Sequence, residues 1–214
     1  MRGAIVVFPG SNCDRDLYYA LERAGMIPQY VWHAESSLPA VQAVFLPGGF
    51  SYGDYLRAGG IARFAPIMEA VETFWRQGGV VIGICNGFQI LTEAGWLPGA
   101  LRRNTSGRFV CSTVEVCSFG KGPLQDYIGE RSYRLPIAHG EGRYVAGVKI
   151  PSWGLRYATS PSPNGSDRGI AGLANEEGTV LGLMPHPERA CDPYQGHLDG
   201  LDFLRAIVRY IAQR

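Results

Sequence analysis

The sequence lacks the features that would mark a membrane protein or a nucleic-acid-binding protein. Its 214 residues carry a formal net charge of only +1, and the only lysines are Lys121 and Lys149. Binding to nucleic acid or to an anionic membrane through bulk charge needs a clear positive excess, so neither partner is expected. No run approaches the ~20 apolar residues that cross a bilayer, and the apolar run at 4–8 is too short for a signal peptide core. We therefore expect a cytoplasmic protein.

Paired cysteines and nucleotide-binding loops are also missing. The five cysteines include no C-x-x-C pair, so the sequence predicts neither a disulfide framework nor a metal site. The segment FPGSN at 8–12 follows an apolar strand but contains neither G-x-G-x-x-G nor a Walker lysine. We expect no nucleotide and no other cofactor in this chain.

What is present is a regular alternation of apolar runs and helical patterns in the first half. With 46% hydrophobic residues the chain can fill one sizeable core, so 1–214 is expected to form a single domain. Strands are predicted at 4–9, 27–33, 44–47 and 80–85, and helices at 14–24, 61–77 and 86–94. This order predicts a parallel sheet with helices on both faces.

The second half consists mainly of further strands. They are predicted at 109–116, 133–139, 155–159, 170–174 and 179–184, with a hairpin turn at 175–178 and a final amphipathic helix at 198–213. The polar loop at 160–168 is expected to be mobile. The expected fold class is therefore α/β, a flavodoxin-like three-layer sandwich with a mostly parallel central sheet and added antiparallel strands.

The segment GICNG places Cys85 between a predicted strand and a predicted helix. This G-x-C-x-G pattern is the cysteine form of a nucleophile elbow, in which a sharp turn exposes the side chain at the carboxyl end of a strand. Glycines on both sides allow strand and helix to approach closely, and the helix start favours a thiolate. Taken alone, the segment is equally compatible with a buried cysteine that ends an apolar strand. The other four cysteines have no such surroundings in the sequence.

The segment PHPE follows the last predicted strand. Residues two apart in an extended chain point to the same side, so Glu188 is expected to accept a hydrogen bond from His186. The order of Cys85, His186 and Glu188, each at a strand end, favours a nucleophile, its base and the group that orients the base. The histidines at 33 and 197 are interpreted as structural or solvated, and His139 as part of a glycine-broken loop that faces a ligand or partner.

A third segment, PGGF at 47–50, also follows a predicted strand. Its glycines allow backbone N–H groups to point at an oxyanion, and the Asn86 N–H at the helix start is a second donor. A plain glycine turn is an equally good interpretation of this segment alone.

Together these segments resemble the class I glutamine amidotransferases. GICNGFQIL, PGGFSYGD and MPHPE carry the resemblance to the class. FPGSNCDRD, PGGFSYGDYLRAG, LPGALRRN and AHGEGRY narrow it to the glutaminase subunits of phosphoribosylformylglycinamidine synthase, an enzyme of de novo purine biosynthesis. The resemblance implies that Cys85, His186 and Glu188 form the catalytic triad. It also implies that Gly49 and Asn86 bind the oxyanion, and that Gln89, Gly140 and Glu141 bind glutamine.

The resemblance also implies partners. Glutamine is hydrolysed to glutamate and ammonia, and a separate synthetase subunit (PurL) with ATP and Mg²⁺ uses the ammonia to form formylglycinamidine ribonucleotide. A small third subunit (PurS) is expected in the complex. The stretch CSTVEVCSFGKGP at 111–123 departs from the family pattern. It is expected to lie away from the triad, which leaves details of the partner contact open.

Two other hypotheses fit part of the sequence. An amidotransferase that feeds another acceptor, as in the imidazole glycerol phosphate or vitamin B6 pathways, would share the triad but not FPGSNCDRD and AHGEGRY. A stress-response or chaperone-like protein would share the cysteine elbow without the adjacent HPE. A binding module without activity would leave the three strand-end segments unexplained.

Overall fold

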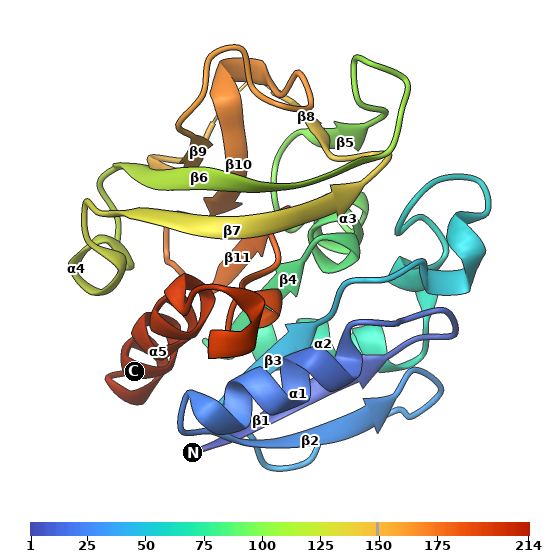
Figure 1. The fold of residues 1–214 in the computed structure, drawn as a ribbon. Helices are drawn as coiled ribbons and strands as arrows, with labels where there is room; N and C mark the ends of the chain where they lie inside the picture. Colours follow the sequence, from blue (N-terminus) through green and yellow to red (C-terminus); the bar gives the residue numbers. More distant parts are fainter. Residues whose placement is uncertain (149) are drawn as a thin grey trace.

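The computed structural model of the chain describes residues 1–148 and 150–214, so Lys149 lies outside the described residues. Its centre is a nine-stranded sheet with the order β2-β1-β3-β4-β11-β10-β9-β6-β7 (Figure 1). The first five strands in this order pair in parallel, and the last four add to them in antiparallel fashion. The predicted mostly parallel sheet with antiparallel additions is confirmed.

The parallel half is built from five short strands: β1 (Arg2–Val7), β2 (Ile27–Trp32), β3 (Ala43–Leu46), β4 (Val80–Ile84) and β11 (Val180–Leu183). All residues of β3, β4 and β11 are buried, as expected for parallel strands covered on both faces. Numbered along the chain within this half, the order is 2-1-3-4-5, the flavodoxin-like arrangement, in which ligands bind at the carboxyl ends of the strands.

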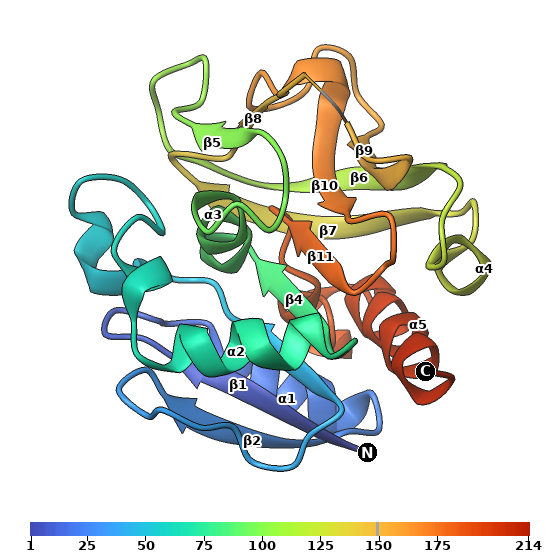
Figure 2. The same ribbon diagram turned by 180° about the vertical axis from the view of Figure 1, so that it is seen from behind.

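Helices cover both faces of this half. The helices α1 (Asp14–Arg23) and α5 (Asp199–Ala212) lie on one face, and α2 (Ile67–Arg76) and α3 (Asn86–Glu93) lie on the other (Figures 1 and 2). The predicted three-layer sandwich is therefore confirmed.

The antiparallel half contains β10 (Ile170–Ala174), β9 (Trp153–Tyr157), β6 (Val110–Gly120) and β7 (Ser132–His139). The predicted hairpin turn is present, because the Gly178 N–H donates to the Asn175 carbonyl at 3.0 Å between β10 and β11. β6 is longer than predicted and runs through most of 111–123. In the sheet, β6 lies between β9 and β7.

The prediction of one continuous helix over 61–77 was wrong for its first part. A 3-10 turn at Ala62–Phe64 comes first, Ala65 is extended, and α2 begins only after Pro66. A residue before proline is pushed out of helical geometry, which explains the break. As a result Phe64 is 72% exposed, whereas Met68 and Val71 of α2 are buried.

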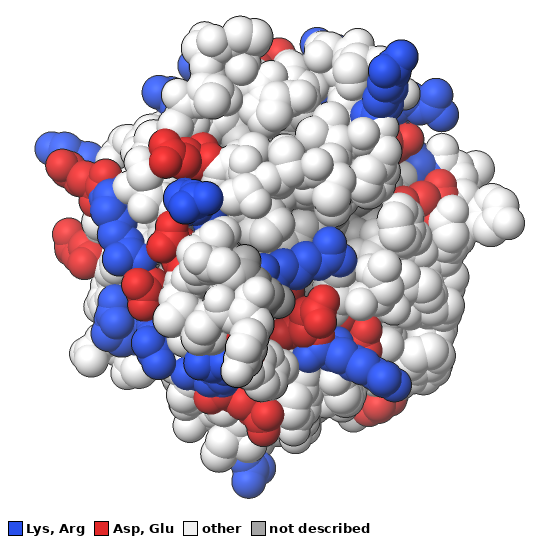
Figure 3. Space-filling model, viewed as in Figure 1, with Lys and Arg blue, Asp and Glu red and all other residues white. Residues whose placement is uncertain are grey.

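Three short elements were not predicted: the paired strands β5 (Ala100–Arg102) and β8 (Arg143–Val145), and the one-turn helix α4 (Gln125–Ile128). Within the described ranges, no helix has the length and apolar character to span a bilayer. Basic and acidic side chains are interspersed over the face in Figure 3, without a field of one sign.

Candidate active site

Cys85 occupies a strained turn between β4 and α3. Its backbone has φ 51° and ψ −103°, a left-handed φ that a side chain rarely adopts. The flanking glycines are required by packing, because a Cβ on Gly83 would lie 2.5 Å from Gly87 and one on Gly87 would lie 2.1 Å from the Leu46 carbonyl oxygen. The predicted nucleophile elbow is confirmed as a geometry, and its strain holds the thiol at the carboxyl end of β4.

Two backbone N–H groups next to Cys85 are available as oxyanion donors. Asn86 is the first residue of α3, where a backbone N–H has no partner within the helix. Gly49 has φ 148°, and no hydrogen bond from its N–H is found among the described residues. A Cβ on Gly49 would lie 2.7 Å from the Ser11 Cα, so this turn packs directly against the loop after β1. Both predicted donors thus lie at neighbouring strand ends.

His186 and Glu188 form a buried hydrogen-bonded pair after β11. The His186 Nδ1 and a Glu188 carboxylate oxygen are 2.6 Å apart, and the residues are 1% and 2% exposed. The predicted partnership is present, but the expected extended chain was wrong, because Pro187–Arg189 forms a 3-10 turn. The His186 N–H donates to the Pro136 carbonyl at 2.8 Å, which fixes this turn against β7.

The charge on His186 is set by competing effects. Burial alone would lower its pKa, but the negative charges of Glu188 and then Cys85 outweigh burial and hold the pKa well above its ordinary value. Cys85 is thus one of the groups that favour a positive charge on the His186 ring. Nε2 of His186 is buried and makes no hydrogen bond of good geometry within the described residues, although Cys13 and Cys85 are close enough to raise the pKa of the ring.

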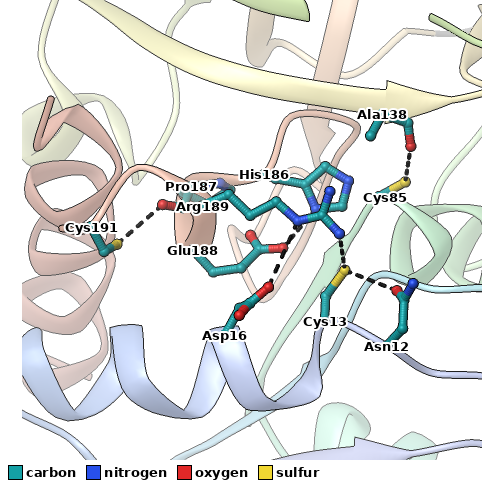
Figure 4. Close-up of polar contacts among 10 residues, drawn as sticks. All are labelled: Asn12, Cys13, Asp16, Cys85, Ala138, His186, Pro187, Glu188, Arg189 and Cys191. Atoms are coloured by element: carbon teal, nitrogen blue, oxygen red, sulfur yellow. Dashed lines mark hydrogen bonds and ion pairs between the residues drawn. The ribbon is translucent and has the colours of Figure 1, made fainter. Parts of the chain in front are cut away.

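Cys13 is a part of the site that the sequence did not indicate. Its thiol lies 2.9 Å from an Arg189 guanidinium nitrogen and 3.2 Å from the Asn12 side-chain oxygen (Figure 4). A Cβ on Gly48 would lie 2.8 Å from the His186 ring and 3.0 Å from the Cys13 sulfur. The expectation that Cys13 lacks special surroundings was therefore wrong. Residues 13 and 189 are far apart in the chain, and only the fold brings them together.

One group of side chains has the donor types of a metal site. A ligand atom from each of Cys13, His186 and Glu188 lies within 4.8 Å of the others, and all three residues are buried. A thiolate, an imidazole and a carboxylate are suitable for zinc. In this chain Glu188 is hydrogen-bonded to the His186 ring, and Arg189 donates to Cys13.

A chain of hydrogen bonds leads from the turn at Cys85 to the segment after β7. The Asn86 side chain donates to the Gln89 side-chain oxygen at 2.9 Å, and Gln89 donates to the Glu141 carbonyl at 2.7 Å. Asn86 also accepts from the Ser51 N–H at 3.1 Å. The side chains of Asn86 and Gln89 thereby connect the loop after β3 with the segment after β7.

Asn104 fixes the segment after β7, which the sequence analysis did not foresee. Its side-chain nitrogen donates to the His139 carbonyl at 2.9 Å, and its oxygen accepts from the Gly142 N–H at 3.2 Å. His139 is the last residue of β7, as the strand predicted at 133–139 requires, and it is 3% exposed. Only its assignment to the glycine-broken loop that follows was wrong. Burial, and then the charge of His186, lowers its pKa to about 4, so His139 is neutral at physiological pH.

The polar loop 160–168 is anchored to the same segment. The Gly142 carbonyl accepts a hydrogen bond from the Asn164 side chain at 2.7 Å, and Asn164, in the middle of the loop, is buried.

These groups surround one cavity of about 380 Å³. Six of the eight predicted site residues line it: Gly49, Cys85, Gln89, Gly140, Glu141 and His186. The side chains of Asn86 and Glu188 are hydrogen-bonded to two of these lining residues, Gln89 and His186. Asp54, Phe109 and Arg189 also line the cavity and were not predicted.

Two further sequence expectations concern His33 and the stretch 111–123. His33 is bonded through Nδ1 to the Tyr52 hydroxyl at 2.6 Å, in agreement with a structural role. The atypical stretch 111–123 is not entirely remote, because Cys111 pairs with Ala138 in the β6–β7 ladder. The Ala138 carbonyl lies 3.9 Å from the Cys85 sulfur, so the start of the stretch is one strand away from the nucleophile.

Comparisons with known proteins agree with this geometry. A family model for a CobB/CobQ-like glutamine amidotransferase domain matches residues 1–152 and 153–200. The phosphoribosylformylglycinamidine synthase subunit PurQ of Thermus thermophilus is 51% identical over 231 residues, covering 100% of both chains. The subunit of the same name from Parasynechococcus marenigrum is 51% identical over 95% of this chain and 98% of its own. A chain in the structure of PurLQS from Thermotoga maritima is 45% identical, covers 98% of both chains and superposes with a TM-score of 0.91.

Proposed function

Because the chain belongs to the glutamine amidotransferase family, and within it to the PurQ subunits of phosphoribosylformylglycinamidine synthase, we propose that it hydrolyses glutamine to supply ammonia for purine biosynthesis. The single observation that carries the proposal is the strained Cys85 turn facing the buried His186–Glu188 pair across one cavity. All 214 residues serve as one glutaminase domain that works in the cytoplasm.

The first half of the reaction forms a thioester. The Cys85 sulfur attacks the carbon of the side-chain carboxamide, and the developing oxyanion accepts hydrogen bonds from the Gly49 and Asn86 N–H groups. The carbon–nitrogen bond then breaks as His186 Nε2 gives its proton to the departing amine. Ammonia leaves, and the glutamyl group stays on Cys85.

Water completes the reaction. His186, now neutral, removes a proton from a water molecule that attacks the thioester, and the carbon–sulfur bond breaks to release glutamate. The Cys85 thiolate and the His186 imidazolium are restored. Glu188 keeps a proton on Nδ1 throughout and so fixes which ring nitrogen faces the reacting groups.

Ammonia transfer needs a partner, because the acceptor chemistry uses ATP. We assign ATP and Mg²⁺ to a PurL-type synthetase subunit and expect a PurS-type third subunit in the same complex. The loop after Gly49 supports activation by this partner: Tyr52, Asp54 and Leu56 have left-handed backbone angles, and Tyr55 and Leu56 are 74% and 94% exposed. A strained loop with exposed apolar side chains is suited to rearrangement or burial when a partner docks.

Two measurements test the proposal. Glutamate release and amidine formation are followed for the chain reconstituted with its synthetase, ATP and formylglycinamide ribonucleotide, and glutamate release is followed for the chain alone. We expect glutamine-dependent amidine formation, and glutamate release that is roughly 10- to 100-fold slower without the partner, as for a misplaced oxyanion donor. Absence of glutamate release in the assembled complex contradicts the glutaminase function. Equal rates with and without the partner contradict only the activation.

A further inference from the structure

A second cavity lies beside the short sheet formed by β5 and β8. It measures about 900 Å³ and is walled by β5, β8 and the segments around Arg57 and Glu93. The catalytic cavity is lined by Cys85 and His186 instead, and the two cavities meet at Glu141, which lines both. Figures 1 and 2 show β5 and β8 side by side above α3, separate from the nine-stranded sheet. The proposed hydrolysis of glutamine gives this second cavity no role.

Arginines dominate the wall of this second cavity. The lining residues include the five arginines Arg57, Arg63, Arg102, Arg103 and Arg143. Among the described residues, Glu93 and Glu141 are the acidic ones that line it, so subtracting two negative charges from five positive ones leaves three positive charges. Arg57 pairs with Glu93 at 2.6 Å, and Arg103 meets Glu141 at 3.6 Å. Because guanidinium groups stay protonated in proteins, the excess is permanent and suits an anion.

Two of these arginines lie directly opposite each other, with no counterion among the described residues. Arg102 of β5 and Arg143 of β8 are cross-strand partners, and both line the cavity. Neither makes an ion pair or a side-chain hydrogen bond with another described residue, and the Arg143 Nε is buried without a partner. Like charges directly opposite destabilise an antiparallel pair, and a buried donor without a partner adds a further cost. An anion between the two guanidinium groups would remove both costs.

The same arginines come from sequence segments that also contribute to the candidate active site. Arg57 belongs to PGGFSYGDYLRAG, Arg102 and Arg103 to LPGALRRN, and Arg143 to AHGEGRY. In the proposed mechanism these arginines have no part. The fold brings them from three stretches of the chain to one cavity, which indicates a ligand other than glutamine.

We propose that the second cavity binds a small molecule that carries a diphosphate group. A phosphate group bears about 1.5 to 2 negative charges at pH 7, so two of them balance the three positive charges better than one phosphate or one carboxylate. The planar guanidinium fork donates two parallel hydrogen bonds to phosphate oxygens, and Arg102 and Arg143 present two such forks to one ligand. A volume of about 900 Å³ is that of a small-molecule site. The site consists of side chains, so glycine-rich loop motifs do not reveal it.

Calorimetry on the full chain tests the site directly. The probes are inorganic pyrophosphate, ADP and inorganic phosphate, each without Mg²⁺ and at constant ionic strength. We expect pyrophosphate or ADP to bind at least roughly 10-fold more tightly than phosphate, since an added charge-assisted hydrogen bond contributes about a factor of 10. Tighter binding of ADP identifies a nucleotide as the ligand, and tighter binding of pyrophosphate identifies a free diphosphate.

Matched variants connect this binding to the opposed arginines. Arg102→Gln and Arg143→Gln should each weaken binding of the tighter probe roughly 10-fold, whereas Arg209→Gln, at an exposed position on α5, should leave it unchanged. Without ligand, Arg102→Gln should raise Tm by roughly 1–3 °C at low salt, because it removes the like-charge pair. The probe should then stabilise the wild type more than the variant.

Three outcomes overturn the inference. In the first, neither pyrophosphate nor ADP binds more tightly than phosphate. In the second, Arg209→Gln weakens binding as much as Arg102→Gln does. In the third, a glutamate-rich peptide binds where the phosphate compounds do not, and the cavity then contacts a protein. Glutamate release by the reconstituted complex is measured separately, so its loss bears on the proposed glutaminase function alone.

Discussion

The two halves of the sheet divide the work of the site. Cys85, His186 and Gly49 follow the parallel strands β4, β11 and β3. In the proposed mechanism they carry the bond-breaking chemistry. The antiparallel half contributes through the end of β7 and the segment beyond it, where Gly140 and Glu141 line the same cavity and are proposed to bind the substrate. The comparison indicates that reaction chemistry and substrate recognition can be disturbed separately.

The geometry of the strands explains this division. Parallel strands all end at one edge of a sheet, so each following turn can add a functional group there. Antiparallel neighbours alternate in direction, and the His186 N–H bond to the Pro136 carbonyl shows how β7 instead packs over the site. Mutations in the two halves should therefore have different kinetic signatures.

The largest effect is expected from removing the nucleophile in the parallel half. Cys85→Ala should lower glutamine-dependent amidine synthesis by roughly 10⁴-fold or more. Synthesis from added ammonia should stay close to wild type, because we assign the ATP-dependent chemistry to the proposed synthetase partner. Both activities are measured in the assembled complex. Loss of both in a complex of normal size would mean that Cys85 is structural.

The second effect sharpens the roles within the parallel half. His186→Ala should be nearly as severe as Cys85→Ala, whereas Glu188→Gln should be roughly 10- to 100-fold less severe, because it removes the orienting charge and keeps the base. Single-turnover release of ammonia measures both. Glu69→Gln on the exposed face of α2 is the control. A Glu188→Gln variant as inactive as His186→Ala would assign Glu188 a larger role than orientation.

The third effect belongs to the antiparallel side. Asn104→Ala removes the bonds that hold His139 and Gly142, so the KM for glutamine should rise roughly 10-fold with a smaller change in kcat. Asn175→Ala is a matched control, since that side chain makes comparable bonds to Thr179 and Val180 in the β10–β11 turn. If kcat falls and KM is unchanged, the two halves are not separable in this way.

The smallest effect concerns stability. The pKa of Asp54 is raised to about 6 in the folded protein from an ordinary value of 3.8, so the folded state binds this proton more tightly than the unfolded state. Stability therefore falls as pH rises from about 4 to about 6, and the ionised carboxylate is unfavourable above that. Asp54→Asn should raise Tm by roughly 2–4 °C at about pH 8, with the difference vanishing near pH 4. Thermal melts at both pH values measure it, and a Tm gain that is independent of pH would contradict the electrostatic cause.

The candidate site residues of the parallel half could be predicted because each belongs to a short sequence pattern. The pattern around Cys85 combines an apolar strand, two glycines and a helix start within ten residues, and the pair at 186 and 188 is equally local. Local patterns specify local geometry. The alternation of strands and helices then predicted a parallel sheet covered by helices on both faces, which the structure confirms.

What the sequence could not reveal depends on contacts between distant segments. Cys13 meets Arg189, and Asn104 meets Gly142, through tertiary packing alone. The late start of α2 had a signal that was missed, since Pro66 disfavours helix at the preceding residue. Asp54 lies in a glycine-rich turn with left-handed backbone angles, and no pattern of side chains in the sequence predicts such angles.

Trp32 can serve as an intrinsic fluorescent probe of the turn that contains Tyr52. The two residues are linked by His33, which is hydrogen-bonded to the Tyr52 hydroxyl and lies against the Trp32 ring. Tyr52 belongs to the turn that follows the oxyanion glycine, and the ring of His33 lies 4.5 Å from that of Trp32. Trp32 is 47% exposed, whereas Trp75 and Trp96 stack on each other and Trp153 is 2% exposed. A water-soluble quencher therefore reaches Trp32 more readily than Trp153. Changes in this emission on adding a partner or a substrate would report movement of the turn without an attached dye.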